Sequence, residues 1–185
     1  MSEDHPIFEE KAWGLNSKQI KLTRLARKLG QEKFSLRAAH YDRTATFPTE
    51  NYKDLFESGL IGVCIPEPSG GHGADFKTYM LTAAEIGRYC GATALTFNMH
   101  VSSCLWSGHL IDTLDIDGAD REKHNVSREI HYKRILNEGA IYAQPFSEGG
   151  SAAAGSSTFQ TIALKVDNGW IVNGKKIFAS LSGHA

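Results

Sequence analysis

The feature that most constrains this chain is a change in its hydrophobic period near Gly139. Before that point apolar residues recur at three- and four-residue spacings, as on one face of a helix, whereas over 161–166 apolar and non-apolar residues alternate, as in a strand. Helices that come first and antiparallel strands that come second predict an α+β fold and not alternating βαβ units. We expect an all-α N-terminal domain over residues 1–138 and the incomplete beginning of an antiparallel β domain over residues 139–185.

Cap and turn residues place the first two helices. Ser17 can cap a helix that runs to about Tyr41, because a serine hydroxyl accepts a hydrogen bond from an unpaired N–H of the first turn. Pro48 suits the first turn of a second helix, since the N–H that it lacks would be unpaired there anyway. The following stretch 66–73 carries two prolines and three glycines, so it is expected to be a fixed loop.

Three more helices and a hairpin are expected after this loop. Asp75 can cap the third helix, a fourth leads to Leu110, and a fifth covers 125–138 after an acidic loop. In the β part, 167–169 has turn chemistry and Asn173-Gly174 is the strongest hairpin signal. The apolar face expected for the third helix consists of Phe76, Tyr79, Met80, Ala83 and either Ile86 or Gly87.

Composition excludes several classes of partner and site. The 185 residues include 20 Lys plus Arg and 21 Asp plus Glu. The chain therefore has no net positive charge that would attract nucleic acid or an anionic membrane. No apolar run approaches the roughly 18 to 20 residues of a membrane span and no secretory leader is visible, which favours a cytoplasmic protein. Cys64, Cys90 and Cys104 lack metal or disulfide spacing and are expected in the core. His100 and His109 lie too far apart to share a metal on adjacent helical turns, so no metal site is expected.

The Ser-, Gly- and Ala-rich loop over 144–158 is the candidate ligand site. Its glycines match neither a phosphate-binding nor a dinucleotide-binding motif, and Gly149-Gly150-Ser151 lacks the spacing of a nucleophile elbow. Small residues nevertheless let backbone N–H groups approach a ligand, and hydroxyls can bond a flat polar ring or a pyrophosphate. From the residues alone, a ligand loop and a plain interdomain loop both remain open.

Ordered matches along the chain resemble the acyl-CoA dehydrogenase family. Residues 65–75 resemble its P-E-x-x-G-G-x-G loop, and 84–87 with 96–100 resemble the segment that borders its acyl pocket. Residues 144–150 are similar to its flavin-contact loop, T-E-P-G-A-G-S-D, and 169–180 to its D-G-x-x-x-x-N-G-x-K-x-W-I-T strand pair. The resemblance covers nearly the whole chain and implies a truncated protein that stops before the family's third domain.

The resemblance also implies a reaction, a cofactor and partners. The full-length enzyme would remove α,β hydrogens from an acyl-CoA thioester, pass hydride to FAD, and hand electrons to an electron-transfer flavoprotein or another acceptor. It would be a homo-oligomer. The family's base is a glutamate of the C-terminal domain, so no residue here is assigned as catalytic. Glu85, Glu138 and Glu148 are expected to serve helix pairing, helix capping and loop solvation respectively.

The resemblance to these motifs also implies which residues would contact the ligands. Ser147 takes the place of the threonine that meets the flavin ring, and its hydroxyl or N–H could bond the ring near N5 and O4. Gly149 stands where the family usually has proline. The serine that would meet the CoA or flavin phosphates is either Ser151 or Ser156. These departures leave the substrate and the reaction subtype open. The implied flavin contacts are Gln144, Phe146, Ser147, Phe178 and Ser180, and the implied acyl-CoA contacts are Ser151, Ser156, Thr96 and Met99.

Two alternatives to the dehydrogenase remain. One is a reduced-flavin monooxygenase of the same fold, in which oxygen and not an acyl carbon meets the flavin. The other is a non-catalytic helical binding module that holds no flavin. Both keep the helical architecture, so the fold does not distinguish them. Oxygen consumption against acceptor-dye reduction would identify the monooxygenase, and the absence of a flavin spectrum would favour the binding module.

Overall fold

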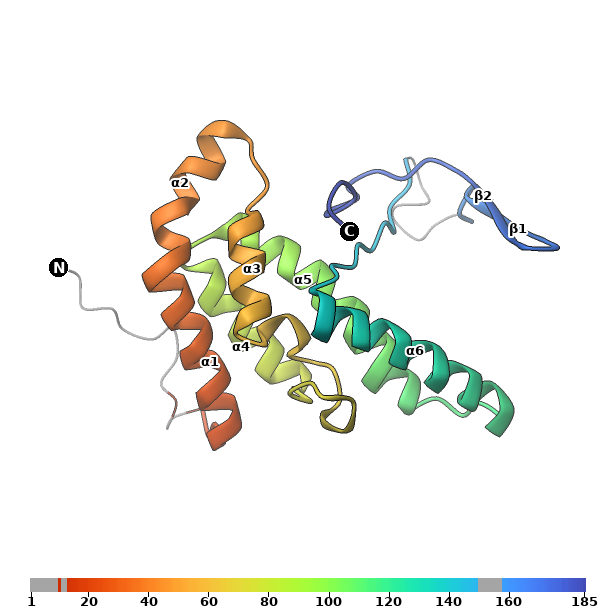
Figure 1. Cartoon of the computed structure of the whole chain (residues 1–185), viewed down its shortest axis with the longest axis horizontal. Helices are drawn as coiled ribbons and strands as arrows, with labels where there is room; N and C mark the ends of the chain where they lie inside the picture. Colours follow the sequence, from red (N-terminus) through yellow and green to blue (C-terminus); the bar gives the residue numbers. More distant parts are fainter. Residues whose placement is uncertain (1–9, 11–12, 150–157) are drawn as a thin grey trace. The chain divides into compact units, whose positions relative to one another are not determined.

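The chain divides into two compact units, residues 1–140 and 141–185. The computed structural model describes residue 10 and residues 13–149 and 158–185. The first unit is helical and the second contains a two-stranded antiparallel sheet (Figure 1). This order of helices and strands confirms the predicted α+β class, whereas the expected domain boundary after residue 138 stays a prediction.

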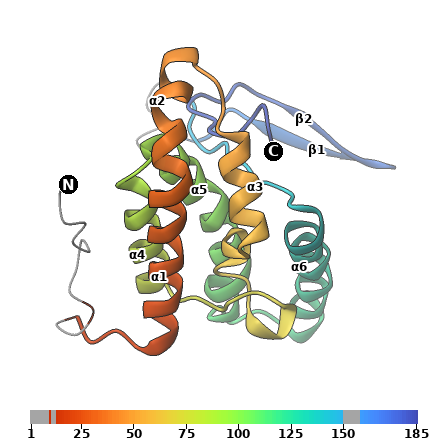
Figure 2. The same cartoon turned by 60° about the vertical axis from the view of Figure 1, so that its left-hand side comes forward.

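The helical unit is built around α4, which packs against both α1 and α5. The helical segments α1, η1 and α2 follow one another without a break and form one long rod (Figures 1 and 2). The short turn η2 contacts α3, α5 and α6, so it lies inside the bundle. The helical elements are α1 (Ser17–Leu29), π-helical η1 (Gly30–Phe34), α2 (Ser35–Thr44), α3 (Thr49–Glu57), 3-10 turns η2 (Leu60–Gly62) and η3 (Glu67–Ser69), α4 (Phe76–Gly87), α5 (Gly91–Leu105), π-helical η4 (Trp106–Leu110) and α6 (Gly118–Glu138).

The first helix is capped by Asn16 and not by Ser17, which corrects the sequence prediction. The Asn16 side chain accepts a hydrogen bond from Gln19 N at 2.9 Å, and the Gln19 side chain accepts one from Asn16 N at 3.0 Å. This reciprocal capping box pairs two N–H groups at the start of the helix. Ser17 consequently becomes the first helical residue, and the helical rod continues past Tyr41 to Thr44.

Aspartates cap two later helices. Asp75 accepts from Thr78 N at 2.8 Å at the start of α4, as predicted. Asp117 does the same for α6, accepting from Asp120 N at 2.8 Å. The last helix therefore begins at Gly118, several residues before the predicted 125, because part of the acidic stretch supplies a cap and a first turn.

The buried face of α4 differs from the predicted apolar face. Phe76 and Met80 are 66% and 46% exposed, whereas Thr82 and Glu85 are fully buried. Thr82 Oγ1 donates to Thr78 O at 2.7 Å, so this hydroxyl is satisfied inside the core. A polar residue with an internal partner can thus occupy a core position that an apolar period does not reveal.

The three cysteines, Cys64, Cys90 and Cys104, are free and buried, which confirms their expected place in the core. Among the described residues, no cluster of three potential metal ligands occurs. None of the helices in the described part of the chain is long and apolar enough to cross a membrane.

His100 lies completely buried on α5, with its Nε2 3.0 Å from Ile61 O. A carbonyl oxygen only accepts, so Nε2 carries a proton. Burial lowers the pKa of His100 from 6.5 to about 4.

This burial predicts acid sensitivity. Between pH 6.5 and 4 the unfolded state binds the proton and the folded state does not, so stability falls as the pH falls, by up to about 1.4 kcal/mol per pH unit. Denaturant unfolding from pH 8 to 4.5 should show this slope, and His100→Gln should reduce it. Partial burial also lowers the pKa of His72, so some slope should remain. The exposed His40→Gln is the control, and equal slopes in the two variants would contradict the assignment.

The second unit contains a hairpin of β1 (Ile162–Val166) and β2 (Gly169–Asn173). Val166 pairs with Gly169 across a two-residue turn, as the turn chemistry predicts. The prediction of a hairpin turn at Asn173-Gly174 is wrong, because β2 ends at Asn173 and no strand follows it in the described residues. A Cβ at Gly174 would lie 2.2 Å from Thr161 Oγ1, so the glycine allows a close approach of two chain segments.

Candidate functional site

The two stretches predicted to contact a flavin lie side by side in the second unit. Ser147 O accepts a hydrogen bond from Ile177 N at 2.9 Å, although the residues are far apart in the sequence. The loop before the hairpin thereby runs along the segment after it. Phe178 follows directly, so this contact brings one predicted flavin residue next to the segment that carries another.

Glu148 anchors this arrangement and is not the solvated loop residue that was expected. Its side chain is 4% exposed and accepts from Lys176 Nζ at 2.7 Å. It also accepts from Gln160 N at 2.6 Å and Thr161 N at 3.0 Å, and from the Thr161 hydroxyl. Four donors from both ends of the hairpin therefore converge on one carboxylate.

These donors keep the carboxylate ionised. The Lys176 ammonium, followed by the hydroxyl and N–H groups of Thr161 and Gln160, lowers the pKa of Glu148 to about 2. A carboxylate that accepts a proton only near pH 2 is a poor general base at neutral pH. Glu148 is thus suited to hold the loop and not to perform proton transfer.

An aromatic pair covers one side of the anchor. The rings of Phe146 and Phe159 meet edge to face with centroids 5.0 Å apart. Lys176 Nζ lies 4.4 Å from the Phe159 centroid and also donates to Phe146 O at 3.2 Å. Lys176 thus contacts the Glu148 carboxylate, the face of the Phe159 ring and the Phe146 carbonyl at the same time.

The residues predicted to contact the flavin differ in their exposure to solvent. Ser147 is half-buried, and within the described part of the chain its hydroxyl has no hydrogen-bond partner. Phe178 is 87% exposed and adopts a left-handed φ of 52°, which is uncommon for a bulky residue. Ser180 N donates to Phe178 O at 3.0 Å, and Gln144 is half-buried. Among the described residues, a hydroxyl without a partner and an exposed aromatic ring are therefore available for a ligand in this unit.

The predicted acyl-CoA residues divide between the two units. Ser151 and Ser156 lie outside the described residues. Thr96 and Met99 are half-buried on α5 of the helical unit, and the Thr96 hydroxyl donates to Ala92 O at 2.9 Å.

The helical unit carries an apolar groove of about 650 Å³ over α4, α5 and η4. Phe76, Met80, Trp106 and Leu110 supply much of its wall and are 46–66% exposed. Sequence reasoning assigned two of them to the core, although their i, i+4 spacing marks a shared face in either case. The groove is lined by Phe76, Tyr79, Met80, Asn98, Ser102, Leu105, Trp106, Leu110 and Thr113.

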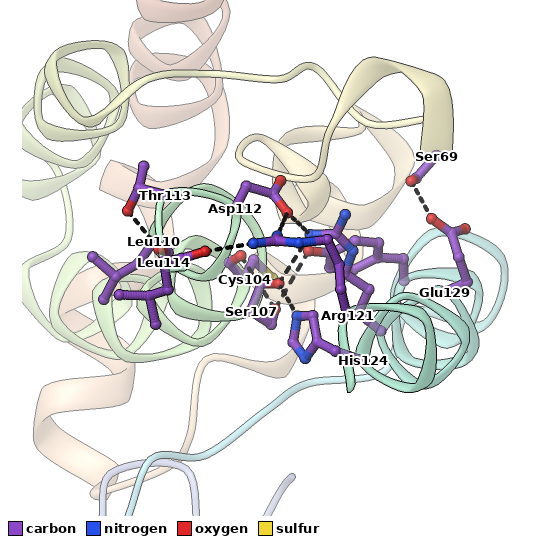
Figure 3. A network of polar contacts seen from close by, with 12 residues as sticks. Ser69, Cys104, Ser107, Leu110, Asp112, Thr113, Leu114, Arg121, His124 and Glu129 are labelled. Carbon is purple, nitrogen blue, oxygen red and sulfur yellow. Dashed lines mark hydrogen bonds and ion pairs between the residues drawn. The ribbon is translucent and has the colours of Figure 1, made fainter. Parts of the chain in front are cut away.

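Polar contacts from α6 hold the π-helical turn that borders this groove (Figure 3). Ser107 O accepts from His124 Nε2 at 2.8 Å and from Arg128 Nη1 at 3.3 Å. Arg128 also pairs with Asp112 at 2.7 Å, and Arg121 donates to Leu114 O. A π-turn disturbs the regular helical ladder, and here α6 supplies donors to a carbonyl of that turn.

Residues 16–111 match the family described as "Acyl-CoA dehydrogenase, N-terminal domain", which is just over half of the chain. The chain belongs to the acyl-CoA dehydrogenase family. The match covers α1 to α5, including the loop at 66–73 and the α5 segment named above.

Individual family members agree with this assignment. The short-chain specific acyl-CoA dehydrogenase of Clostridium acetobutylicum is 26% identical over 174 residues, which cover 94% of this chain and 42% of that protein. Butyryl-CoA dehydrogenase from Megasphaera elsdenii is 26% identical with a TM-score of 0.72, over 92% of this chain and 43% of that one. The chain therefore spans about two fifths of the length of these relatives.

The same fold occurs in a protein with a different name. A nitrososynthase from Micromonospora carbonacea var. africana has a TM-score of 0.73 at 19% identity, over 91% of this chain and 40% of that one. At this identity the likeness shows the fold alone, so it does not distinguish one activity from another.

Sequence reasoning missed the importance of the Glu148–Lys176 pair. Both residues lie in the two stretches that resemble family motifs, and that was the available signal. Their pairing spans 28 positions and depends on the hairpin between them, so no local spacing reveals it.

Proposed function

We propose that this chain is the helical domain and the first strands of the β domain of a flavoprotein acyl-CoA dehydrogenase. The whole enzyme would bind FAD, remove the α and β hydrogens of an acyl-CoA thioester, and pass electrons to an electron-transfer flavoprotein or another acceptor. We propose a homo-oligomer, and we assign no catalytic base among these residues. Bound FAD would accept the substrate's β hydrogen as a hydride.

The contact between Ser147 O and Ile177 N carries this proposal. It joins the two stretches whose sequences resemble the family's flavin contacts, and it leaves the Ser147 hydroxyl without a partner in the described part of the chain. A hydroxyl donor and an exposed aromatic ring on these two stretches suit the polar edge and the flat face of an isoalloxazine ring. Gln144, Phe146, Ser147, Phe178 and Ser180 are the residues that we propose would contact it.

The apolar groove of the helical unit supports the acyl part of the proposal. Asn98 of the segment that resembles the family's acyl-pocket border lines this groove, together with aromatic and aliphatic side chains. Such a wall can remove an acyl chain from water. We therefore propose Thr96 and Met99 near the acyl portion, and Ser151 or Ser156 near the phosphates.

The test uses the complete product of the gene that encodes this chain. We expect a yellow protein with a flavin spectrum that reduces an acceptor dye when acyl-CoA is added. Oxygen consumption with reduced flavin, without acyl-CoA-dependent dye reduction, would favour the monooxygenase instead. Freshly purified protein without flavin would contradict both and favour a helical binding module.

Ser147→Ala tests the flavin contact directly. We expect about two- to tenfold weaker flavin binding, which corresponds to the loss of one neutral hydrogen bond. Apoprotein titrated with FAD and followed by flavin fluorescence measures this change. Ser182→Ala, on an exposed serine of the same unit, should leave the affinity unchanged. Equal affinities for the two variants would remove Ser147 from the site.

A further inference from the structure

We propose that Glu148 is the positioning residue of the flavin-contact loop and that it acts through the Ser147 hydroxyl. The inference rests on the proposed function, since it concerns the same flavin site. It adds a residue that the alignment with family motifs did not place at the flavin, and it gives the Glu148–Lys176 pair a role in setting the cofactor's environment.

Three consecutive loop residues are held to the segment after the hairpin. Phe146 O accepts from Lys176 Nζ at 3.2 Å, and Ser147 O accepts from Ile177 N at 2.9 Å. The Glu148 carboxylate then accepts from Lys176 Nζ at 2.7 Å. These bonds fix the peptide groups on both sides of Ser147 and use its carbonyl, so its hydroxyl and its N–H remain as donors in the described part of the chain.

The carboxylate also binds the start of the hairpin. Gln160 N and Thr161 N donate to separate oxygens of Glu148, at 2.6 and 3.0 Å, and the Thr161 hydroxyl joins them. A single buried group therefore links the loop to both ends of the β-hairpin. Without it, the loop would rely on the two carbonyl contacts alone, and the Ser147 donors would not be held in one orientation.

An anionic acceptor is needed at this position. An ionised carboxylate has only acceptor sites, and here every neighbour named above is a donor. A glutamine would turn an NH₂ group toward one of these donors, although its size is the same. Charge-assisted bonds are also roughly twice as strong as neutral ones, so the change weakens every bond that remains.

The decisive experiment is a double-mutant cycle in the complete flavoprotein, with wild type, Ser147→Ala, Glu148→Gln and the double variant. Each is measured for its FAD dissociation constant and for the flavin midpoint potential. We expect Glu148→Gln to weaken FAD binding by about ten- to hundredfold. It should also shift the potential in the same direction as Ser147→Ala.

Coupling between the two sites separates positioning from a general structural role. If Glu148 acts through the Ser147 hydroxyl, Glu148→Gln should change the potential much less in the Ser147→Ala background than in wild type. A potential shift of equal size in both backgrounds would overturn the proposal. An unchanged potential in the Glu148→Gln single variant would also overturn it.

Further variants keep the test decisive if Glu148→Gln does not fold. Thr161→Val removes one donor to the carboxylate and should give a smaller shift of the same sign, whereas an unchanged potential would overturn the proposal. Lys176→Met should weaken FAD binding, and the neighbouring Lys175→Met, on an exposed lysine, is its matched control.

The outcomes also separate this inference from the proposed function. A wild-type protein that binds no flavin overturns both. A wild type with bound flavin whose potential responds to Ser147→Ala and not to Glu148→Gln keeps the proposed function and overturns the positioning role alone.

Discussion

Glu85→Ala is expected to destabilise the helical unit by about 3 to 5 kcal/mol, because it breaks a buried ion pair by removing one partner. Glu85 is fully buried, and its two oxygens accept from Arg27 Nη2 at 2.8 Å and from Arg88 Nη1 at 3.3 Å. The Arg27 side chain is only 15% exposed. The variant therefore leaves a largely buried guanidinium opposite a cavity, without its carboxylate.

Denaturant unfolding of the 185-residue chain, followed by helical circular dichroism, measures this effect. Glu122→Ala, on an exposed position of α6, is the matched control and should change stability by less than about 0.5 kcal/mol. The double variant Arg27→Ala/Glu85→Ala should lose less than the sum of its single variants, since it removes both partners of the Arg27–Glu85 pair and leaves neither of these two charges buried alone. Equal losses in Glu85→Ala and Glu122→Ala would contradict the importance of the pair.

The same residue shows where sequence reasoning succeeds. Glu85 was expected to pair between helices, and its contact with Arg27 confirms that expectation. The alternation of strand residues and the Asp75 cap were also predicted correctly, because each signal is contained in a few adjacent residues. The capping box of Asn16 and Gln19 was equally local, but the adjacent serine was chosen in its place.

Other features could not be read from local patterns. The buried face of α4 includes threonine and glutamate side chains whose partners come from the same helix or from α1. Their burial therefore depends on packing and not on their own hydropathy. The Glu148 anchor likewise needs the hairpin to bring residues 148, 160 and 176 together. Family motifs indicated that these stretches matter, whereas only the structure indicates how they are held.

Phe97→Ala should cost about 3 to 5 kcal/mol, because it creates a cavity in the core of the helical unit. Phe97 is fully buried on α5, which packs against α4. Phe76, on α4, is 66% exposed and makes a matched control with the same loss of a phenyl group. We expect Phe76→Ala to change the free energy of unfolding by less than about 0.5 kcal/mol, as surface substitutions usually do.

The comparison of these two phenylalanines tests the packing of α4 directly. The apolar period of the sequence places Phe76 on the buried face, and if that face were correct the two variants would lose similar stability in the same denaturant titration. A large difference supports the observed face, in which threonines and Glu85 point inward and Phe76 lines the groove. In that case Phe76 forms part of the wall of the groove without contributing to the core, as expected of an exposed apolar residue that contacts a ligand or another part of the protein.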